Sequence, residues 1–130
     1  MDLILDFIFI LFYLILGFYN ILRIKNRVVA KDILNLKFLL FYHLIFGVFY
    51  YFYTVNELVD SYTYWSISRD LQINSISELF NSGLGTEMIV SINFIPFNII
   101  GLSYFQGTLM YSFLGFLGFL YLYLTIKNTI

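Results

Sequence analysis

The sequence predicts an all-α membrane protein, and its composition, length and hydropathy pattern support this prediction. Hydrophobic residues make up 61% of the 130 residues and charged residues 12%, whereas soluble domains contain roughly 25% charged residues. A small domain folded in water leaves a large fraction of its surface exposed, so this chain could not hide its apolar surface there. Three segments also approach or exceed the roughly 20 mostly apolar residues that cross a bilayer. We therefore expect the lipid bilayer to be the solvent for this chain.

The first predicted span covers residues 3–22, with Asp6 as its only charged residue. Asp6 lies within about one helical turn of the end of the segment, where a carboxylate still reaches headgroups and water. The segment has neither the basic stretch nor the small-residue cleavage site of a signal peptide. We therefore expect it to remain in the mature protein as a transmembrane helix.

The second predicted span, residues 38–55, contains no charged residue and ends in the aromatic run FYYFY at 49–53. Tyrosines at a helix end anchor it at the interface, with the ring toward lipid and the hydroxyl toward water. His43 lies within this span. We interpret it as a neutral imidazole that is hydrogen-bonded to a neighbouring helix.

The third predicted span, residues 105–126, is free of charge and is followed by Lys127. Thr108, Ser112 and Gly115 recur on one helical face, and small residues on one face let helices approach closely. This pattern predicts a packing surface for further helices. We therefore expect residues 1–130 to form one membrane domain that is a fragment of a larger bundle, with further transmembrane helices as partners.

Residues 88–100 are strongly apolar but too short to be a clear span. The segment also contains Pro96 and the side-chain amides of Asn93 and Asn98. Apolar segments of about 10–14 residues are more often interfacial, re-entrant or buried than spanning. We expect a helix that lies on the membrane or dips into it. The alternative, a fourth and kinked span over residues 88–104, stays open from the sequence.

The distribution of charge predicts the orientation. Five of the seven basic residues lie between the first two spans, namely Arg23, Lys25, Arg27, Lys31 and Lys37. Short cytoplasmic loops are enriched in lysine and arginine, so this connection is expected in the cytoplasm. The N-terminus is then outside, the region 54–103 is outside, and the C-terminus is cytoplasmic.

The external region, residues 54–103, is too long for a bare connection, and its pattern predicts two or three short interfacial helices. Leu58, Tyr62 and Trp65 recur on one helical face, which leaves Asp60, Ser61 and Ser68 largely on the polar side. SISE at 75–78 fits a capping box, with Gly83 placed to end that helix. Thr86 is expected to cap the apolar segment that follows, with Glu87 in its first turn.

The candidate site residues follow the second span. Asp60 is a carboxylate at the membrane interface that can act as a general base or bind a cation, and Tyr64 and Trp65 suit stacking on a sugar ring. Arg69 is the only basic residue of the external region, so it can bind a phosphate. The simpler interpretations are a solvated acid for Asp60, and an ion pair with nearby acids or headgroups for Arg69.

Other functional classes are disfavoured by composition. The chain has no Cys and a single His, which excludes disulfides, thiolate metal sites and clusters of histidine ligands; we identify no metal site and no cofactor. The net charge of −1 gives no electrostatic reason to expect a nucleic-acid partner.

The order of these features resembles the amino-terminal part of multi-span envelope-polysaccharide proteins of Bacteroidetes-type bacteria. The resemblance covers roughly residue 36 onward and depends on three short motifs: DSYTYW at 60–65, GTE at 85–87 and SYF at 103–105. Those proteins are similar to polyprenyl-phosphate-dependent GT-C glycosyltransferases and to polysaccharide-polymerase membrane proteins. GT-C enzymes have many more spans and usually carry the acidic loop after the first span, whereas here it follows the second.

The resemblance implies an amino-terminal fragment of an enzyme that transfers a sugar from a lipid-phosphate donor, on the outer face of a bacterial cytoplasmic membrane. It implies that Asp60 is the catalytic base or a metal-binding carboxylate. Tyr64 and Trp65 would then shape the acceptor site and Arg69 would contact phosphate. A divalent cation is implied only together with the lipid-phosphate sugar donor.

A second functional class also fits the sequence: a non-catalytic small subunit of a larger bacterial or organellar membrane complex. Membrane subunits rich in Phe, Tyr, Ile and Asn are what AT-rich genomes encode. A transporter or channel is disfavoured, because a single His and the lack of intramembrane charge pairs leave little to form an ion path.

Overall fold

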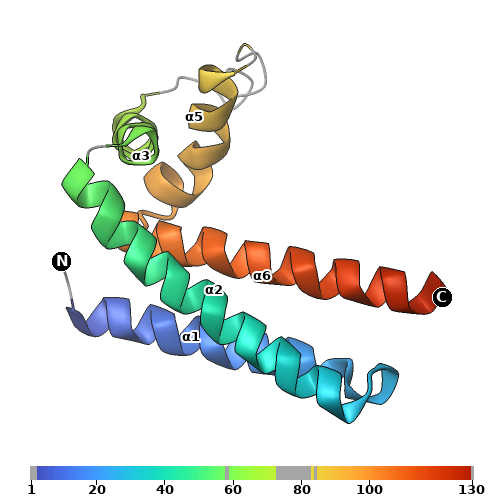
Figure 1. Ribbon diagram of the computed structural model, residues 1–130. Coiled ribbons are helices and arrows are strands. Elements are labelled where there is room, and N and C mark those ends of the chain that lie inside the picture. Colours follow the sequence, from blue (N-terminus) through green and yellow to red (C-terminus); the bar gives the residue numbers. More distant parts are fainter. Residues whose placement is uncertain (1–2, 58, 73–82, 84, 130) are drawn as a thin grey trace. The chain divides into compact units, whose positions relative to one another are not determined.

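All regular secondary structure in the described part of the chain is helical, and that part contains no β-strand. The structure is a computed structural model that describes residues 3–57, 59–72, 83 and 85–129 (Figure 1). Its elements are α1 (Leu3–Arg23), η1 (Lys25–Arg27), α2 (Ala30–Glu57), α3 (Asp60–Asp70), α5 (Thr86–Phe94), η2 (Ile95–Ile99) and α6 (Tyr104–Thr129). The all-α prediction is confirmed.

Three of these helices are long and apolar enough to cross a membrane: α1, α2 and α6 over Tyr104–Lys127. They contain the three predicted spans. The largest difference is at α2, which begins at Ala30, eight residues before the predicted start at residue 38. Hydropathy finds only the apolar part of a helix, whereas Asp32 in the first turn of α2 favours a helix start through the helix dipole.

The alternative fourth span over residues 88–104 is not formed. The nine residues of α5 continue into η2, a π-helix of five residues that contains Pro96. Gly101 then takes a φ of 76°, a left-handed conformation that favours glycine, and the N–H of Leu102 donates to the Pro96 carbonyl at 3.0 Å. The chain therefore turns here, and α6 begins as a separate helix.

The start of α6 is a capping box that the sequence analysis did not identify. The Ser103 hydroxyl accepts the N–H of Gln106 at 3.2 Å, and the Gln106 side-chain oxygen accepts the N–H of Ser103 at 3.1 Å. These reciprocal bonds satisfy two donors that the first turn of a helix leaves free. The pattern S-x-x-Q is visible at 103–106, but it stands within an apolar stretch that was assigned by hydropathy alone.

The chain divides into two compact units. The first unit consists of Met1–Tyr50 with Thr108–Ile130, and the second unit of Tyr51–Gly107. Helices α2 and α6 each contribute residues to both units. The expectation of a single membrane domain within a larger bundle stays a prediction.

In the first unit, α1 packs on α2 and α6 through small residues and aromatic rings. Gly17 lies against the fully buried Leu40 of α2, and the rings of Phe18 and Phe41 meet edge to face at 5.9 Å. Between α1 and α6, the rings of Tyr13 and Phe113 lie 5.2 Å apart. Asp6, expected near headgroups, is instead buried in the protein.

The small-residue face of α6 is occupied within the chain. The Ser112 hydroxyl would lie 2.6 Å from a Cβ added to Gly47 of α2, and Gly115 lies against the His43 ring. This part of the face therefore joins α6 to α2, and it is not available to further helices as predicted. Gly118, by contrast, has open space where a Cβ would be.

His43 does not bond to a neighbouring helix, contrary to the prediction. Its Nδ1 lies 2.9 Å from the Leu39 carbonyl of its own helix, so Nδ1 carries the proton, because a carbonyl can only accept. The ring packs on Phe116 and Phe119 of α6, with centroids 6.3 and 5.5 Å away. The imidazole thus serves as a packing group whose donor is satisfied within one turn of helix.

A polar cluster joins the start of α2 to the end of α6. The Tyr123 hydroxyl donates to the Asp32 carboxylate, and the Lys127 amine lies 3.3 Å from the same carboxylate oxygen. These two helix ends therefore lie on the same side of the first unit.

Candidate functional site

The candidate site is built on α3, whose ends are defined by backbone and side-chain bonds. Val59 precedes the helix in an extended conformation, and its carbonyl accepts the N–H of Tyr62 at 3.0 Å. At the other end, the side-chain amide of Asn98 donates to the carbonyls of Arg69 and Leu71 at 2.7 and 3.0 Å. Carbonyls at a helix C-terminus have no partner within the helix, so Asn98 caps α3 from η2.

Ser68 attaches α3 to α5. Its side chain has no exposed surface, and its hydroxyl lies 3.1 Å from the Val90 carbonyl of α5 and 2.6 Å from the Tyr64 carbonyl of its own helix. The buried hydroxyl is shared between the two carbonyls, and its contact with Val90 joins α3 to α5. Ser68 was expected on the polar side of this helix, and that expectation is wrong.

An aromatic and hydroxyl cluster lies beside α3 in the second unit. We call it the Tyr104 cluster, and its members are Tyr51, Thr54, Ser61, Tyr62, Trp65 and Tyr104. The Tyr104 hydroxyl lies 2.8 Å from that of the fully buried Thr54 and 2.9 Å from that of Ser61. The Tyr104 ring meets Tyr62 edge to face at 5.1 Å and lies 5.5 Å from Trp65. The cluster thereby ties α3 to the ends of α2 and α6 that belong to this unit.

The predicted face of Leu58, Tyr62 and Trp65 is confirmed for the part that is described. The rings of Tyr62 and Trp65 lie 5.2 Å apart, and both turn toward Tyr104. Leu58 lies outside the described residues. Ser61, expected on the polar side, is half-buried because its hydroxyl reaches Tyr104.

The structure brings together only two of the four predicted site residues. The Arg69 guanidinium lies over the Trp65 ring, 5.4 Å from its centroid, which is within the range of a cation–π contact. Asp60 is exposed at the start of the helix, and Tyr64 follows one turn later, half-buried. Since a helix turns about 100° per residue, Asp60 and Tyr64 share one face, while Trp65 and Arg69 lie well around the helix from Asp60.

The charged groups of α3 are not paired with each other. Among the described residues, neither Asp60 nor Arg69 has an ion pair with another side chain. Arg69 therefore stacks on Trp65 and forms no ion pair with a described acid; pairing with an acid outside the described residues stays an interpretation. Within the described side chains, the two ends of α3 thus present a carboxylate and a guanidinium without an ion-pair partner.

The expected N-cap of α5 is displaced by one residue. Thr86 is the first helical residue, and Gly85, at a φ of 85°, takes the cap position without a side-chain bond. Glu87 is in the first turn as predicted, and its carboxylate accepts the N–H of Gly83 at 2.7 Å. The capping box predicted at 75–78 lies outside the described residues.

No metal site is assembled by the residues that the structure describes. No three His, Asp or Glu side chains among them lie close enough to share an ion. Asp60 alone provides one carboxylate, whereas protein sites for Mg²⁺ and Ca²⁺ combine several oxygen ligands. We therefore derive no chemical step through a cation.

The hydroxyl of Tyr104 is expected to stabilise the second unit. Replacing Tyr104 with phenylalanine removes its bonds to Thr54 and Ser61 but keeps the ring, and each such bond contributes about 1 kcal/mol. We expect faster amide exchange in residues 60–70, measured by hydrogen–deuterium exchange in detergent micelles. The control is Tyr121→Phe, because Tyr121 is an exposed tyrosine of the same helix and makes no side-chain bond among the described residues. Equal exchange in both variants would contradict a structural role for the Tyr104 hydroxyl.

Comparison of the chain with protein-family models, with curated proteins and with solved structures finds no match. Its function is therefore inferred from its own residues.

Proposed function

We propose that this chain is part of a membrane glycosyltransferase or polysaccharide polymerase that uses a lipid-phosphate sugar donor. The observation that supports this most directly is the position of Asp60 on a helix that is fixed by contacts with its neighbours. It is exposed and unpaired among the described side chains, and it stands at the start of a helix that Ser68, Asn98 and the Tyr104 cluster hold in place. A catalytic carboxylate needs such a support, because small displacements of a reacting group lower the rate strongly.

In this proposal Asp60 acts as the general base for the acceptor. The acceptor hydroxyl attacks the anomeric carbon of the donor sugar and gives its proton to the Asp60 carboxylate. A new carbon–oxygen bond forms as the bond from that carbon to the lipid phosphate breaks, and the phosphate leaves with the electron pair.

The neighbouring residues have matching roles. Tyr64 is one turn from Asp60 on the same face, so its ring is placed to pack against a sugar that reaches the carboxylate. Trp65 holds the Arg69 guanidinium by stacking, and that group keeps N–H donors for the donor phosphate. Asp60 and Arg69 lie nine residues apart on α3, or about 13 Å along a helix axis. They also face different sides of the helix, so in this proposal the sugar lies at Asp60 and the donor phosphate reaches around α3 to Arg69.

The remaining parts of the site come from further helices in this proposal. Most residues of each spanning window are at least partly accessible, since only 22%, 22% and 28% of the residues in the windows of α1, α2 and α6 are buried. Surface of this kind is open to lipid and to other apolar helices. The proposed location is a bacterial cytoplasmic membrane, with α3 on the outer face, as the positive charge between α1 and α2 indicates.

The test is replacement of Asp60 by asparagine in the producing cell. Loss of a general base lowers the rate by about 100-fold or more, so glycan assembly should fall to near background while the protein still inserts in the membrane. The matched control is Asp70→Asn, an exposed acid at the other end of the same helix, which should leave glycan output unchanged. Unchanged glycan in the Asp60 variant would refute the proposal.

The exposed apolar faces also favour a second candidate, a non-catalytic subunit of a larger membrane complex. In that case the Asp60 variant keeps normal function. A partner of constant stoichiometry would then copurify with the tagged chain after mild detergent extraction.

A further inference from the structure

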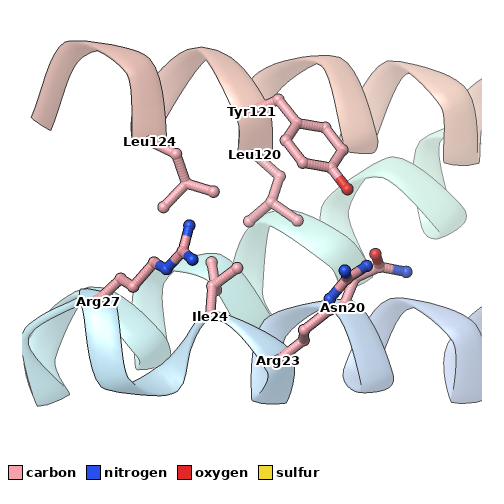
Figure 2. A pocket seen from close by; sticks show the side chains of 7 residues that line it. All are labelled: Asn20, Arg23, Ile24, Arg27, Leu120, Tyr121 and Leu124. Atoms are coloured by element: carbon pink, nitrogen blue, oxygen red, sulfur yellow. The ribbon is translucent and has the colours of Figure 1, made fainter. Parts of the chain in front are cut away.

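A second feature lies in the first unit. The end of α1, the turn η1 and the last turns of α6 enclose a pocket of about 190 Å³, several times the roughly 30 Å³ that a water molecule occupies in the liquid. Figure 2 shows its lining: Asn20, Arg23, Ile24, Arg27, Leu120, Tyr121 and Leu124.

The polar groups of this pocket are mostly donors. Arg23 and Arg27 extend from the end of α1 and from η1 toward the space below α6, and the Tyr121 hydroxyl points from α6 into the same space (Figure 2). Each guanidinium carries five N–H groups. The Asn20 amide is oriented by its bond to the Leu16 carbonyl at 2.8 Å.

The two arginines lack a counter-ion in the part of the chain that the structure describes. Neither forms an ion pair or a side-chain hydrogen bond with any described residue. Asp32, in the first turn of α2, is the only acid among residues 23–37, and it is bound by Tyr123 and Lys127. Two like charges beside one hollow repel each other, and an anion held between them offsets that repulsion.

The pocket also has an apolar side. Ile24, Leu120 and Leu124 complete the lining, and the pocket lies at the ends of two helices that are long enough to span a membrane. Such an arrangement suits a ligand with an anionic head and an apolar tail. Basic pockets between transmembrane helices on the cytoplasmic side bind anionic lipid headgroups in this way.

We propose that this pocket binds a phosphate group, and that the phosphate belongs to the headgroup of an anionic phospholipid. Arg23 and Arg27 donate to the phosphate oxygens, Tyr121 adds a hydroxyl donor, and Leu120 and Leu124 lie beside the start of the acyl chains. The site is independent of Asp60 and of sugar transfer.

The experiment uses the full chain in nanodiscs of phosphatidylcholine with a minor fraction of phosphatidylglycerol. Native mass spectrometry after release counts the phosphatidylglycerol molecules that stay bound. Each basic residue near an anionic surface contributes about 1 kcal/mol, so Arg23→Gln with Arg27→Gln should lower retention by at least about tenfold. Lys25→Gln removes one positive charge from η1 at a position outside the lining, and it should retain phosphatidylglycerol like the parent.

A variant without a charge change tests the pocket itself. Leu124→Trp fills the hollow and should also abolish retention, while circular dichroism should show unchanged helix content. Inorganic phosphate separates the two sources of the ligand group: lipid that stays bound in its presence supports the headgroup, and lipid displaced at low phosphate concentration supports a soluble phosphate compound in the same site.

Two results would overturn the proposal. The first is retention at the parental level in the double arginine variant or in the Leu124 variant. The second is a loss in the Lys25 variant that equals, per charge removed, the loss in the double arginine variant, since that would show a diffuse attraction of basic residues to anionic lipid.

Discussion

Replacing Phe116 with alanine is expected to produce the largest loss of stability in the first unit. Its side chain has no exposed surface, and its ring lies 5.9 Å from that of Phe113 and 6.3 Å from that of His43. Phenylalanine-to-alanine substitutions in cores cost about 3–5 kcal/mol. We expect the lower end of that range, because helices that separate within a membrane expose their faces to lipid and not to water.

The measurement is the free energy of unfolding from a titration of micellar protein with sodium dodecyl sulfate, followed by near-ultraviolet circular dichroism. Phe49→Ala is the matched control, since Phe49 is a phenylalanine of α2 with 69% of its surface exposed and contributes little to the core. If the Phe116 and Phe49 variants have the same free energy of unfolding, the Phe116 ring does not hold α6 in the unit.

Replacing Gly107 with alanine is expected to produce the largest loss in the second unit. A Cβ at Gly107 would overlap the ring of Phe97, which is rigid and buried, with 4% of its surface exposed. Overpacking of this kind costs about 1–3 kcal/mol. The π-helix η2 is what brings Phe97 onto this glycine, so we expect the effect to appear in residues 86–100.

Gly118→Ala is the control for Gly107→Ala because it makes the same change in the same helix where nothing lies within 4 Å. Alanine is favoured over glycine in helices by up to about 1 kcal/mol, so this control should be neutral or slightly stabilised. Hydrogen–deuterium exchange of residues 86–100 should be faster in the Gly107 variant alone. Equal exchange in both variants would contradict the close packing of Phe97 on α6.

The candidate site was predictable only in part. Periodicity predicts the helix α3 and its face with Tyr62 and Trp65, because a helix repeats every 3.6 residues whatever it packs against. Ser61 and Ser68 lie two helical turns apart on one face, which was predicted to be polar. Their hydroxyls are buried because Tyr104 and the Val90 carbonyl meet them there, and these partners are distant in sequence.

The small residues of α6 show the same division. Their spacing correctly indicated a face of close helix approach, since small side chains permit it in any helix. The predicted partner, a further helix, was wrong, because Gly47 and His43 of α2 lie against that face. A pattern on one helix describes the shape of its surface and carries no information on which other helix lies against it.

The sequence alone determined the helical class, the three helices that are long enough to cross a membrane, and the concentration of positive charge between the first two. These features depend on the thickness of the bilayer and on the cost of placing charge in it, which act on each segment separately. Only the tertiary structure decided the pairing of Asp32 with Lys127, the packing of Phe97 from the π-helix η2 on Gly107, and the pocket that Arg23 and Arg27 line together with α6. Each of these joins residues far apart in the chain, and contacts of that kind depend on how the helices pack.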